Sequence, residues 1–446
     1  MLTMRSVFLK NVLMIASGTA AAQLLTAAIT PFLTRLYGPE AFGVFGLFVS
    51  VLAVLLPIAT LAFPKAIVLP REEAEAENLA LISLLCVLFA SALVTVLMFA
   101  LGPIAVGLGS LSIDSRFQYL IPAGLLCLAA IEISKQLLFR GGAFRPVAVL
   151  IFLQSLFVNS FKLVFGLLAP KAVVLVLLSV GGNAFLAGSL IRVVKEQRRD
   201  VISSQPLSSC LAQRWGSLWE LAKRYSDFPL FRAPQAVLNA LVSHSPLLLM
   251  GALFGPASAG FYFIARKFLE LPTNLIGQAV GDVLYPKLAE ADKNHQSCFA
   301  PIVRVTGTFL LLGCAPVSLV FLYGEPIFTL VLGAGWEVAG RYAEWIALWA
   351  FSTLLARPSI TAIPVLNMQG WYLIFELVSS FGRIAAILGA FIISASDYLA
   401  VVAFSCISAI FNLALITVVL WSSKWAKGGL SQRGERRMPH SDDPIA

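Results

Sequence analysis

The sequence predicts an all-α, polytopic membrane protein with about twelve membrane-spanning helices in two six-helix bundles. Hydrophobic residues make up 59% of the 446 residues and charged residues only 12%, and the mean hydropathy is +0.87. Soluble domains carry about 25% charged residues, so this chain cannot cover a water-facing surface. Its apolar residues come in blocks of about 20 or more, the helix length that crosses a ~30 Å hydrocarbon core. Alternating segments of about 10 residues, typical of membrane β-barrels, are absent.

Twelve apolar segments are expected to cross the membrane. The first six lie at residues 11–34, 41–63, 78–101, 118–140, 147–168 and 171–192. The second six lie at residues 229–253, 259–285, 301–323, 342–365, 371–393 and 398–421. This layout predicts an N-terminal lobe over 1–194, a cytoplasmic linker over 195–227, a C-terminal lobe over 228–423 and a basic cytoplasmic tail over 424–446.

The distribution of basic residues predicts that both termini are cytoplasmic. With the N-terminus inside, the cytoplasmic segments and adjoining span ends hold 21 Lys and Arg, and the outer loops and their edges hold four. Such an excess marks the cytoplasmic side, so the net charge of +9 does not indicate nucleic-acid binding. The linker contains "RWGSLWELAKRY", Arg214 to Tyr225. This segment is either an amphipathic helix on the inner membrane surface or an ordinary connection.

Nearly the same turn sequence occurs twice, once in each half of the chain. "LYGPEAFGVFG" from Leu36 is followed 217 residues later by "LFGPASAGFYF" from Leu253. Gly suits the position after a helix, and Pro suits the first position of the next helix, so each copy predicts a tight outer hairpin. Both following helices are expected to end at a cytoplasmic Pro-Lys pair, Pro64-Lys65 and Pro286-Lys287. Since six spans per half give both halves the same orientation, the chain is a parallel repeat, an architecture of transporters that work by alternating access.

Several stretches resemble a known family. "FLTRLYGPEAFGVFGLF", "FPKAIVLPREEAEAENL" and "LFGPASAGFYFIARKFLELPTNLIGQAVGDVLYPKLAEA" are similar to the Wzx-type polysaccharide flippases of the multidrug/oligosaccharidyl-lipid/polysaccharide exporter superfamily. The resemblance implies two six-helix bundles in a V around a central cavity. It also implies a bacterial inner-membrane protein that moves a polyprenyl-pyrophosphate-linked oligosaccharide from the cytoplasmic to the periplasmic leaflet. The product would be O-antigen, capsule or exopolysaccharide, and a polymerase and export machinery are possible partners besides membrane lipids.

Charged residues inside the spans are the first candidates for a substrate site. A charge at the bilayer centre costs at least ~2.5–3.5 kcal/mol, so it marks function by default. A pyrophosphate requires cations, and we expect these to line the cavity: Arg266, Lys267, Arg383, Arg232 and Lys162. Arg232, Arg304 and Arg357 lie near the cytoplasmic ends of their spans, where snorkelling is an alternative. Arg383 shares a face with Glu376, seven residues earlier, so a structural ion pair is an alternative there.

Polar residues in spans 8 and 1 extend the candidate site. Asn274 and Gln278 lie on the same half-polar side of span 8 as the charged residues, and that side must face protein or water rather than lipid. In span 1, spacings of four, three and four residues place one polar stripe on a single face: Thr19, Gln23, Thr26 and Thr30. The stripe either contacts sugar hydroxyls or makes interhelical hydrogen bonds.

Energy coupling has four candidate groups, and no cofactor is expected. His titrates near neutral pH, and nearby carboxyl groups would extend a proton or ion path: His244, Glu270, Asp282 and Glu376. The sequence contains no G-x-x-x-x-G-K-[ST] motif for ATP. Its six cysteines form no C-x-x-C pattern, so neither a metal site nor a disulfide framework is indicated.

Two other functions remain as alternatives. An ion-coupled small-molecule or drug exporter has the same fold, but span 1 lacks the acidic residue common in such exporters. A membrane glycosyltransferase or polymerase is disfavoured because the outer loops are short and hold no cluster of catalytic acids. We therefore expect a transporter rather than an enzyme.

Overall fold

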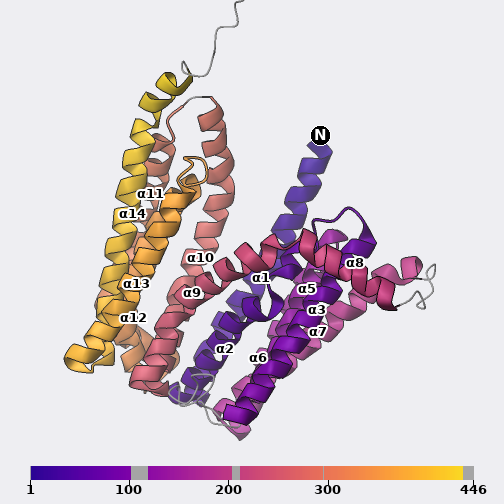
Figure 1. The fold of residues 1–446 in the computed structure, drawn as a ribbon. Coiled ribbons are helices and arrows are strands. Elements are labelled where there is room, and N and C mark those ends of the chain that lie inside the picture. Colours follow the sequence, from indigo (N-terminus) through magenta and orange to yellow (C-terminus); the bar gives the residue numbers. More distant parts are fainter. Residues whose placement is uncertain (1, 102–118, 203–210, 295, 435–446) are drawn as a thin grey trace, which may run out of the picture. The chain divides into compact units, whose positions relative to one another are not determined.

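The computed structural model describes residues 2–101, 119–202, 211–294 and 296–434, and the side chains of 17–100, 119–197, 218–294 and 296–424. Helices account for nearly all of this part of the chain, which contains no β-strand (Figure 1). The α-helices are α1 (Leu2–Leu36), α2 (Pro39–Thr60), α3 (Glu73–Leu101), α5 (Leu120–Arg140), α6 (Phe144–Leu168), α7 (Ala172–Ile202), α8 (Leu211–Arg224), α9 (Ala233–Phe254), α10 (Pro256–Lys293), α11 (Phe299–Leu332), α12 (Glu337–Ala362), α13 (Gln369–Ser394) and α14 (Asp397–Gly434). Two short turns are the 3₁₀ helix η1 (Phe63–Ala66) and the π-helix η4 (Phe228–Arg232).

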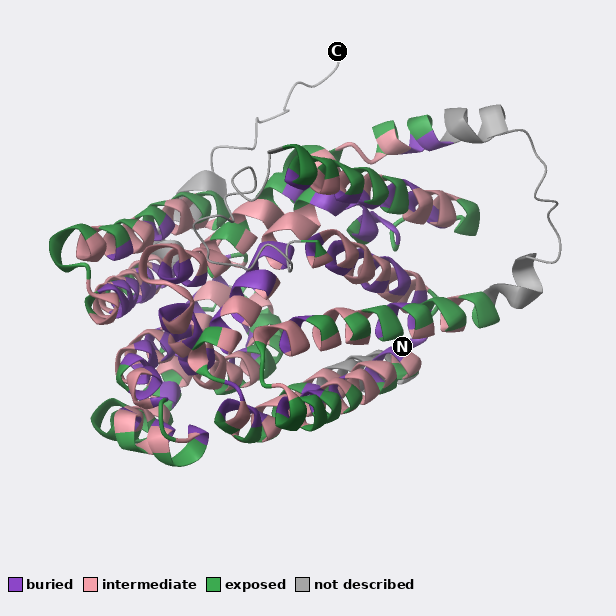
Figure 2. Ribbon diagram, turned by 90° about the horizontal axis from the view of Figure 1, so that it is seen from below, coloured by how far each residue is buried: buried purple, intermediate pink, exposed green. Residues whose placement is uncertain are grey.

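The prediction of an all-α, multi-pass membrane protein is confirmed. Within the described residues, nine helices are long and apolar enough to cross a membrane. The three other long helices, α1, α10 and α12, correspond to predicted spans 1, 8 and 10. Large apolar side chains also stay exposed along the helices, for example Leu311 at 81% and Ile393 at 86%. Figure 2 colours the exposed residues of the helices green. Large apolar side chains at exposed positions suit a surrounding of lipid rather than water.

Some helices run past the ends of their predicted spans. α7 continues to Ile202 and α10 to Lys293. Pro286 therefore lies inside α10, so the expectation that this helix ends at Pro286-Lys287 was wrong. A proline inside a helix removes one backbone N–H donor and is unfavourable there, so the continuation of α10 past Pro286 was not expected. α11 has non-helical dihedrals at Tyr323, the predicted end of span 9, and then resumes helical structure to Leu332.

The chain divides into two compact units. Unit 1 comprises residues 1–264 and 330–336, and unit 2 comprises residues 265–329 and 337–446. Unit 1 therefore includes α9 and the start of α10 together with α1 to α8. The predicted division into lobes at residues 194 and 228 stays a prediction.

The two repeated turns pack directly on each other within unit 1. A Cβ atom built on Gly43 would overlap the carbonyl oxygen of Pro256, and one built on Gly260 would overlap that of Pro39. The contact is reciprocal, with the backbone at the start of α2 against the backbone at the start of α10. Only glycine at both positions permits this approach, so the repeated G-P-x-x-x-G pattern has a packing role.

Residues 330–336, from the second half of the sequence, pack against the same end of unit 1. Trp336 is buried, donates from Nε1 to the carbonyl oxygen of Thr34 at 2.9 Å, and packs edge-on against Phe42 and Phe261. Thr34 in turn donates to the carbonyl oxygen of Leu332 at 3.0 Å. These bonds attach residues 330–336 to α1, α2 and α10.

The predicted linker helix docks on protein. Leu218 and Leu221 of α8 are buried in one hydrophobic cluster with Phe63, Ile67 and Leu79. Arg224 at the end of α8 forms a 2.6 Å ion pair with Glu75 of α3, and Trp219 stays exposed. The helix is therefore amphipathic, and its apolar face covers η1 and α3. Its position on the inner membrane surface stays a prediction.

Candidate functional site

Unit 2 contains several arginines that form ion pairs or hydrogen bonds, and the first of them lies on α10. Arg266 Nε lies 2.8 Å from Glu270 Oε1, one helical turn away, and both side chains are partly buried. Its guanidinium carbon also lies 5.4 Å from the centre of the Trp349 ring of α12. An ion pair and a cation–π contact together stabilise the arginine away from water. Of the two basic residues predicted here, Arg266 is thus held in place, and Lys267 beside it is half-buried.

Arg357 of α12 faces α10. Its Nη2 donates to Asn274 Oδ1 at 2.9 Å, and its Cγ and Nε lie 3.1 Å from a Cβ built on Gly277. Its Nε is buried without a hydrogen-bond partner among the described residues. Snorkelling was one alternative for this residue, and the structure packs its side chain on Gly277, three residues after Asn274. The N-x-x-G spacing of α10 carries both contacts.

α13 contributes the third arginine of unit 2. Arg383 Nη1 lies 3.7 Å from Glu376 Oε1, and the Arg383 side chain is only 16% exposed. The shared face predicted for this pair is therefore present. Tyr372, on the same helix, lies close enough to Glu376, Arg383 and Arg357 to interact electrostatically with all three. The α12 and α13 arginines therefore belong to one polar region of unit 2. Gln278 and Asp282, further along α10, are exposed.

In unit 1 the polar stripe of α1 divides. Thr26 Oγ1 accepts from Asn159 Nδ2 at 3.0 Å and lies 3.0 Å from Ser155 Oγ, which joins α1 to α6. Thr30 is fully buried and donates to the carbonyl oxygen of Thr26 at 2.6 Å. Thr26 thus makes interhelical contacts, whereas this bond of Thr30 lies within α1. Gln23 is exposed and Thr19 half-buried, so these two stay available to a ligand.

Lys162 and His244, also in unit 1, each contact α2. Lys162 is 7% exposed, and its Nζ lies 4.4 Å from the centre of the Phe45 ring. His244 Nδ1 lies 3.0 Å from Ser50 Oγ. Among the predicted groups, Lys162, Arg232, His244 and the α1 stripe thus belong to unit 1, and the α10 and α13 residues belong to unit 2.

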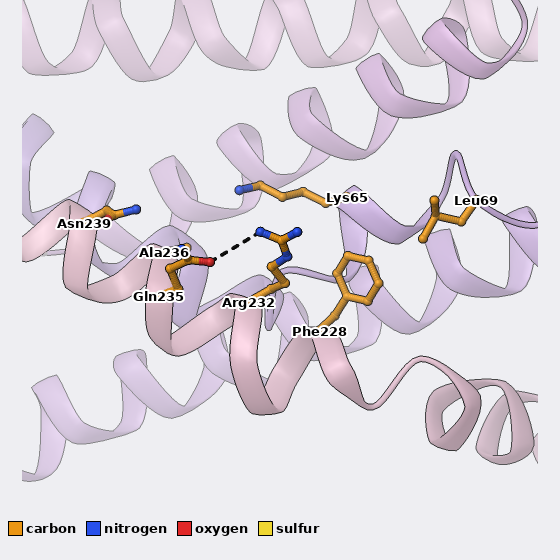
Figure 3. Close-up of a pocket in the computed structure, with 7 residues that line it drawn as sticks. All are labelled: Lys65, Leu69, Phe228, Arg232, Gln235, Ala236 and Asn239. Atoms are coloured by element: carbon orange, nitrogen blue, oxygen red, sulfur yellow. Dashed lines mark hydrogen bonds between the residues drawn. The ribbon is translucent and has the colours of Figure 1, made fainter. Parts of the chain in front are cut away.

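Arg232 lies in a pocket of unit 1 that the sequence analysis did not foresee. The cavity has a volume of about 490 Å³ and lies between the segment after α2 and the start of α9 (Figure 3). It is lined by Lys65, Leu69, Phe228, Arg232, Gln235, Ala236 and Asn239. Lys65 and Arg232 point into the same space in Figure 3. Lys65 was counted only as a cytoplasmic marker, because no periodic pattern relates it to Arg232.

The described residues offer no metal centre. No group of three or more His, Cys, Asp and Glu side chains among them lies close enough to hold an ion. The charged clusters can act on a ligand through electrostatic attraction and hydrogen bonding.

Comparison with known proteins gives the family and the fold. Residues 32–340 match the family model described as "Polysaccharide biosynthesis protein". The succinoglycan biosynthesis transport protein ExoT of Rhizobium meliloti (strain 1021) is 25% identical over 385 residues, which are 83% of this chain and 71% of the relative.

Two solved structures with the same fold are transporters by name. The lipid II flippase MurJ in an inward closed conformation superposes with a TM-score of 0.67 at 12% identity, over 93% of this chain and 90% of that one. An inward-facing multidrug resistance MATE family transporter of the MOP superfamily superposes with a TM-score of 0.66 at 14% identity, over 92% and 96%. Because the family model spans well over half of the sequence and confirms the resemblance noted from the repeated turns, this chain belongs to the polysaccharide biosynthesis protein family.

Proposed function

We propose that this protein flips a lipid-linked oligosaccharide, a polyprenyl diphosphate carrying a polysaccharide repeat unit, from the cytoplasmic to the periplasmic leaflet. It would act in the bacterial inner membrane, with both termini cytoplasmic, by alternating access and as a transporter rather than an enzyme. The membership of a polysaccharide biosynthesis family and the named activity of its succinoglycan-transport relative support this class of substrate.

The observation that carries the proposal is the excess of arginine in the predicted spans of unit 2. Arg266, Arg357 and Arg383 lie on three different helices and are matched by two nearby carboxylates, Glu270 and Glu376. A net positive charge held in a membrane-embedded region is costly. It is offset when a ligand brings negative charge, which a diphosphate does, and arginine is the side chain that best binds phosphate oxygens in pairs.

Sugar recognition would fall to uncharged polar groups. Gln23, Thr19 and Gln278 present amides and a hydroxyl that the described contacts leave at least partly exposed. Such groups donate and accept hydrogen bonds with sugar hydroxyls. A polymerase and the export machinery would receive the flipped product on the outer side.

Genetic complementation tests the proposal. A host whose own copy of the gene is deleted would receive the wild-type gene, the double variant Arg266→Gln/Lys267→Gln, or Arg383→Gln. Surface polysaccharide should be lost in both variants, the lipid-linked repeat unit should accumulate, and immunoblots of membranes should show normal protein levels. Arg304→Gln is the matched control, since it removes one exposed positive charge from α11 and should leave polymer unchanged. Normal polymer in both test variants would refute the cationic site.

An ion-coupled exporter of small molecules is the second candidate. The Arg266–Glu270 ion pair favours it, because a carboxylate that releases an arginine on protonation is a workable coupling element. The two candidates separate in one strain. Deletion should abolish polysaccharide without changing the minimum inhibitory concentrations of cationic drugs if the protein is a flippase, and do the reverse if it is a drug exporter.

A further inference from the structure

The pocket around Lys65 and Arg232 has the composition of an anion site. Its lining residues comprise two cations, two amides and three apolar residues, and none of them is a carboxylate. Among the described side chains, neither Lys65 nor Arg232 forms an ion pair. The carboxylate of Glu132 near Lys65 is paired with Lys135 at 2.9 Å. Two positive charges thus converge on one concave space without a protein anion between them.

The turn that presents Lys65 is strained. α2 ends at Thr60, and Leu61 (φ 49°) and Ala62 (φ 56°) both adopt the left-handed conformation before η1 begins. Two successive non-glycine residues in this region cost free energy, and such strain concentrates at ligand sites. The buried neighbours Phe63 and Ala66 anchor the turn, and Lys65 between them is exposed.

The repeat itself does not require this turn. The equivalent dipeptide of the second half, Pro286-Lys287, lies inside the continuous helix α10. The same two residue types thus continue a helix in one half and close a 3₁₀ turn over a pocket in the other. The difference indicates that a local interaction in the first half favours the turn that places Lys65 at the pocket.

Arg232 is presented by a second unusual element. It ends the π-helical turn η4, none of whose five residues is buried. π-helical turns are rare and occur frequently at functional sites, because the extra residue changes which side chain faces a ligand. Arg232 Nη1 lies 3.4 Å from Gln235 Oε1 (Figure 3), which orients the guanidinium along the pocket wall without neutralising it.

One hydrophobic cluster holds both presenting elements. Phe63 and Ile67 around η1 pack with Leu218 and Leu221 of α8, and Phe228 of η4 packs against the same cluster. The backbone segments that carry Lys65 and Arg232 therefore share a common core. Segments that are already fixed before a ligand arrives lower the entropy cost of binding.

We propose that this pocket binds the phosphate headgroup of a lipid at the predicted cytoplasmic end of unit 1. Two cations match the charge of a phosphate or diphosphate, and the Gln235 and Asn239 amides supply further donors. A volume of about 490 Å³ accommodates a headgroup, and Leu69, which is 57% exposed, offers an apolar rim to a lipid chain. The phosphate comes either from the diphosphate of the transported carrier, a source that rests on the proposed function, or from an anionic phospholipid of the bilayer, which does not.

Native mass spectrometry of the purified full-length protein tests this site. The protein would be titrated separately with farnesyl diphosphate, dioleoylphosphatidylglycerol and inorganic diphosphate, and one-to-one adducts would be quantified. We expect Lys65→Gln/Arg232→Gln to weaken binding of at least one phosphate lipid about 10-fold or more, as expected for losing charge-assisted hydrogen bonds. Loss for farnesyl diphosphate alone assigns the carrier, and loss for phosphatidylglycerol assigns the bilayer lipid.

Two control variants distinguish the pocket from a general effect of positive charge. Lys287→Gln removes a positive charge from the equivalent Pro-Lys dipeptide outside the pocket and should leave both affinities unchanged. Gln235→Glu keeps both cations, places a carboxylate beside Arg232 and should weaken binding about as much as a single cation loss. Wild-type affinity for both lipids in the double variant, or an equal loss in Lys287→Gln, would overturn the proposal. Since complementation by the Arg266, Lys267 and Arg383 variants is measured separately, a failure here leaves the test of flipping untouched.

Discussion

Replacing Gly43 with alanine tests the packing of the two repeated turns. The added Cβ would overlap the Pro256 carbonyl oxygen, lie 2.6 Å from its carbon and lie 3.0 Å from the Gly260 nitrogen. All of these atoms are backbone, so no side chain can rotate away, and the two helix starts must separate. Overpacking costs about 1–3 kcal/mol, and we take the upper end because the obstacle is a backbone. Gly260→Ala meets the Pro39 backbone in the same way and should cost a similar amount.

Thermal unfolding of the detergent-solubilised protein measures this cost. We expect each substitution to lower the midpoint by on the order of 5 °C. The double variant should lose less than the sum, because helices already separated by one methyl group accommodate the second more easily. Gly38→Ala is the matched control within the same turn. It has no atom within 4 Å of its Cβ and a φ of −70°, so it should unfold at the wild-type temperature. Wild-type midpoints for Gly43→Ala and Gly260→Ala, or an equal loss in Gly38→Ala, would refute the reasoning.

Three further predictions follow from individual contacts. Asn159→Leu removes the hydrogen bond from Asn159 of α6 to Thr26 of α1 and should destabilise the detergent-solubilised protein by about 0.5–2 kcal/mol; an unchanged midpoint would contradict this. Glu376→Gln and Arg383→Gln should show a coupling of about 1 kcal/mol in a double-mutant cycle, reduced from the value for a buried pair by partial exposure; additive effects would exclude the pair. Burial and the nearby charge of Asp292 raise the pKa of the Cys298 thiol, so its maleimide labelling should be slow at pH 7 and accelerate as pH rises, whereas unfolded protein should label quickly at both.

Much of the fold was predictable because membrane solvation leaves few options. A backbone in hydrocarbon must satisfy its own hydrogen bonds, so long apolar blocks become helices. The Gly-Pro turns were equally predictable. Glycine is favoured just after the end of a helix, and proline is favoured at the first position of the next helix. Helix ends were less predictable. Both helices were expected to end at a Pro-Lys pair, but α10 continues past Pro286, and α2 ends at Thr60, before Pro64.

The sequence did not predict which residues of other helices contact each polar side chain. The spacing of Thr26 and Thr30 defined a face, but it gave no way to know that α6 would bring Asn159 against that face. Similarly, Arg266 and Glu270 were one turn apart and predictable as a pair, whereas Trp349 of α12, which contacts Arg266, lies 83 positions further along the chain. Arg357 illustrates the same limit, since depth alone suggested snorkelling and only the packing on Gly277 turns it inward. Periodicity describes one helix at a time, and sites form between helices.

The two halves of the repeat keep one shared feature and lose another. At the predicted outer end, both glycines are needed because each approaches the backbone of the other turn, so a change in either half disturbs both. At the predicted cytoplasmic end, the two Pro-Lys pairs differ in conformation. The second half continues as a helix. In the first half, two residues adopt the left-handed conformation, and Lys65 lines the same pocket as Arg232. Packing therefore accounts for the symmetry that is kept, and binding of an anion accounts for the strain where it is lost.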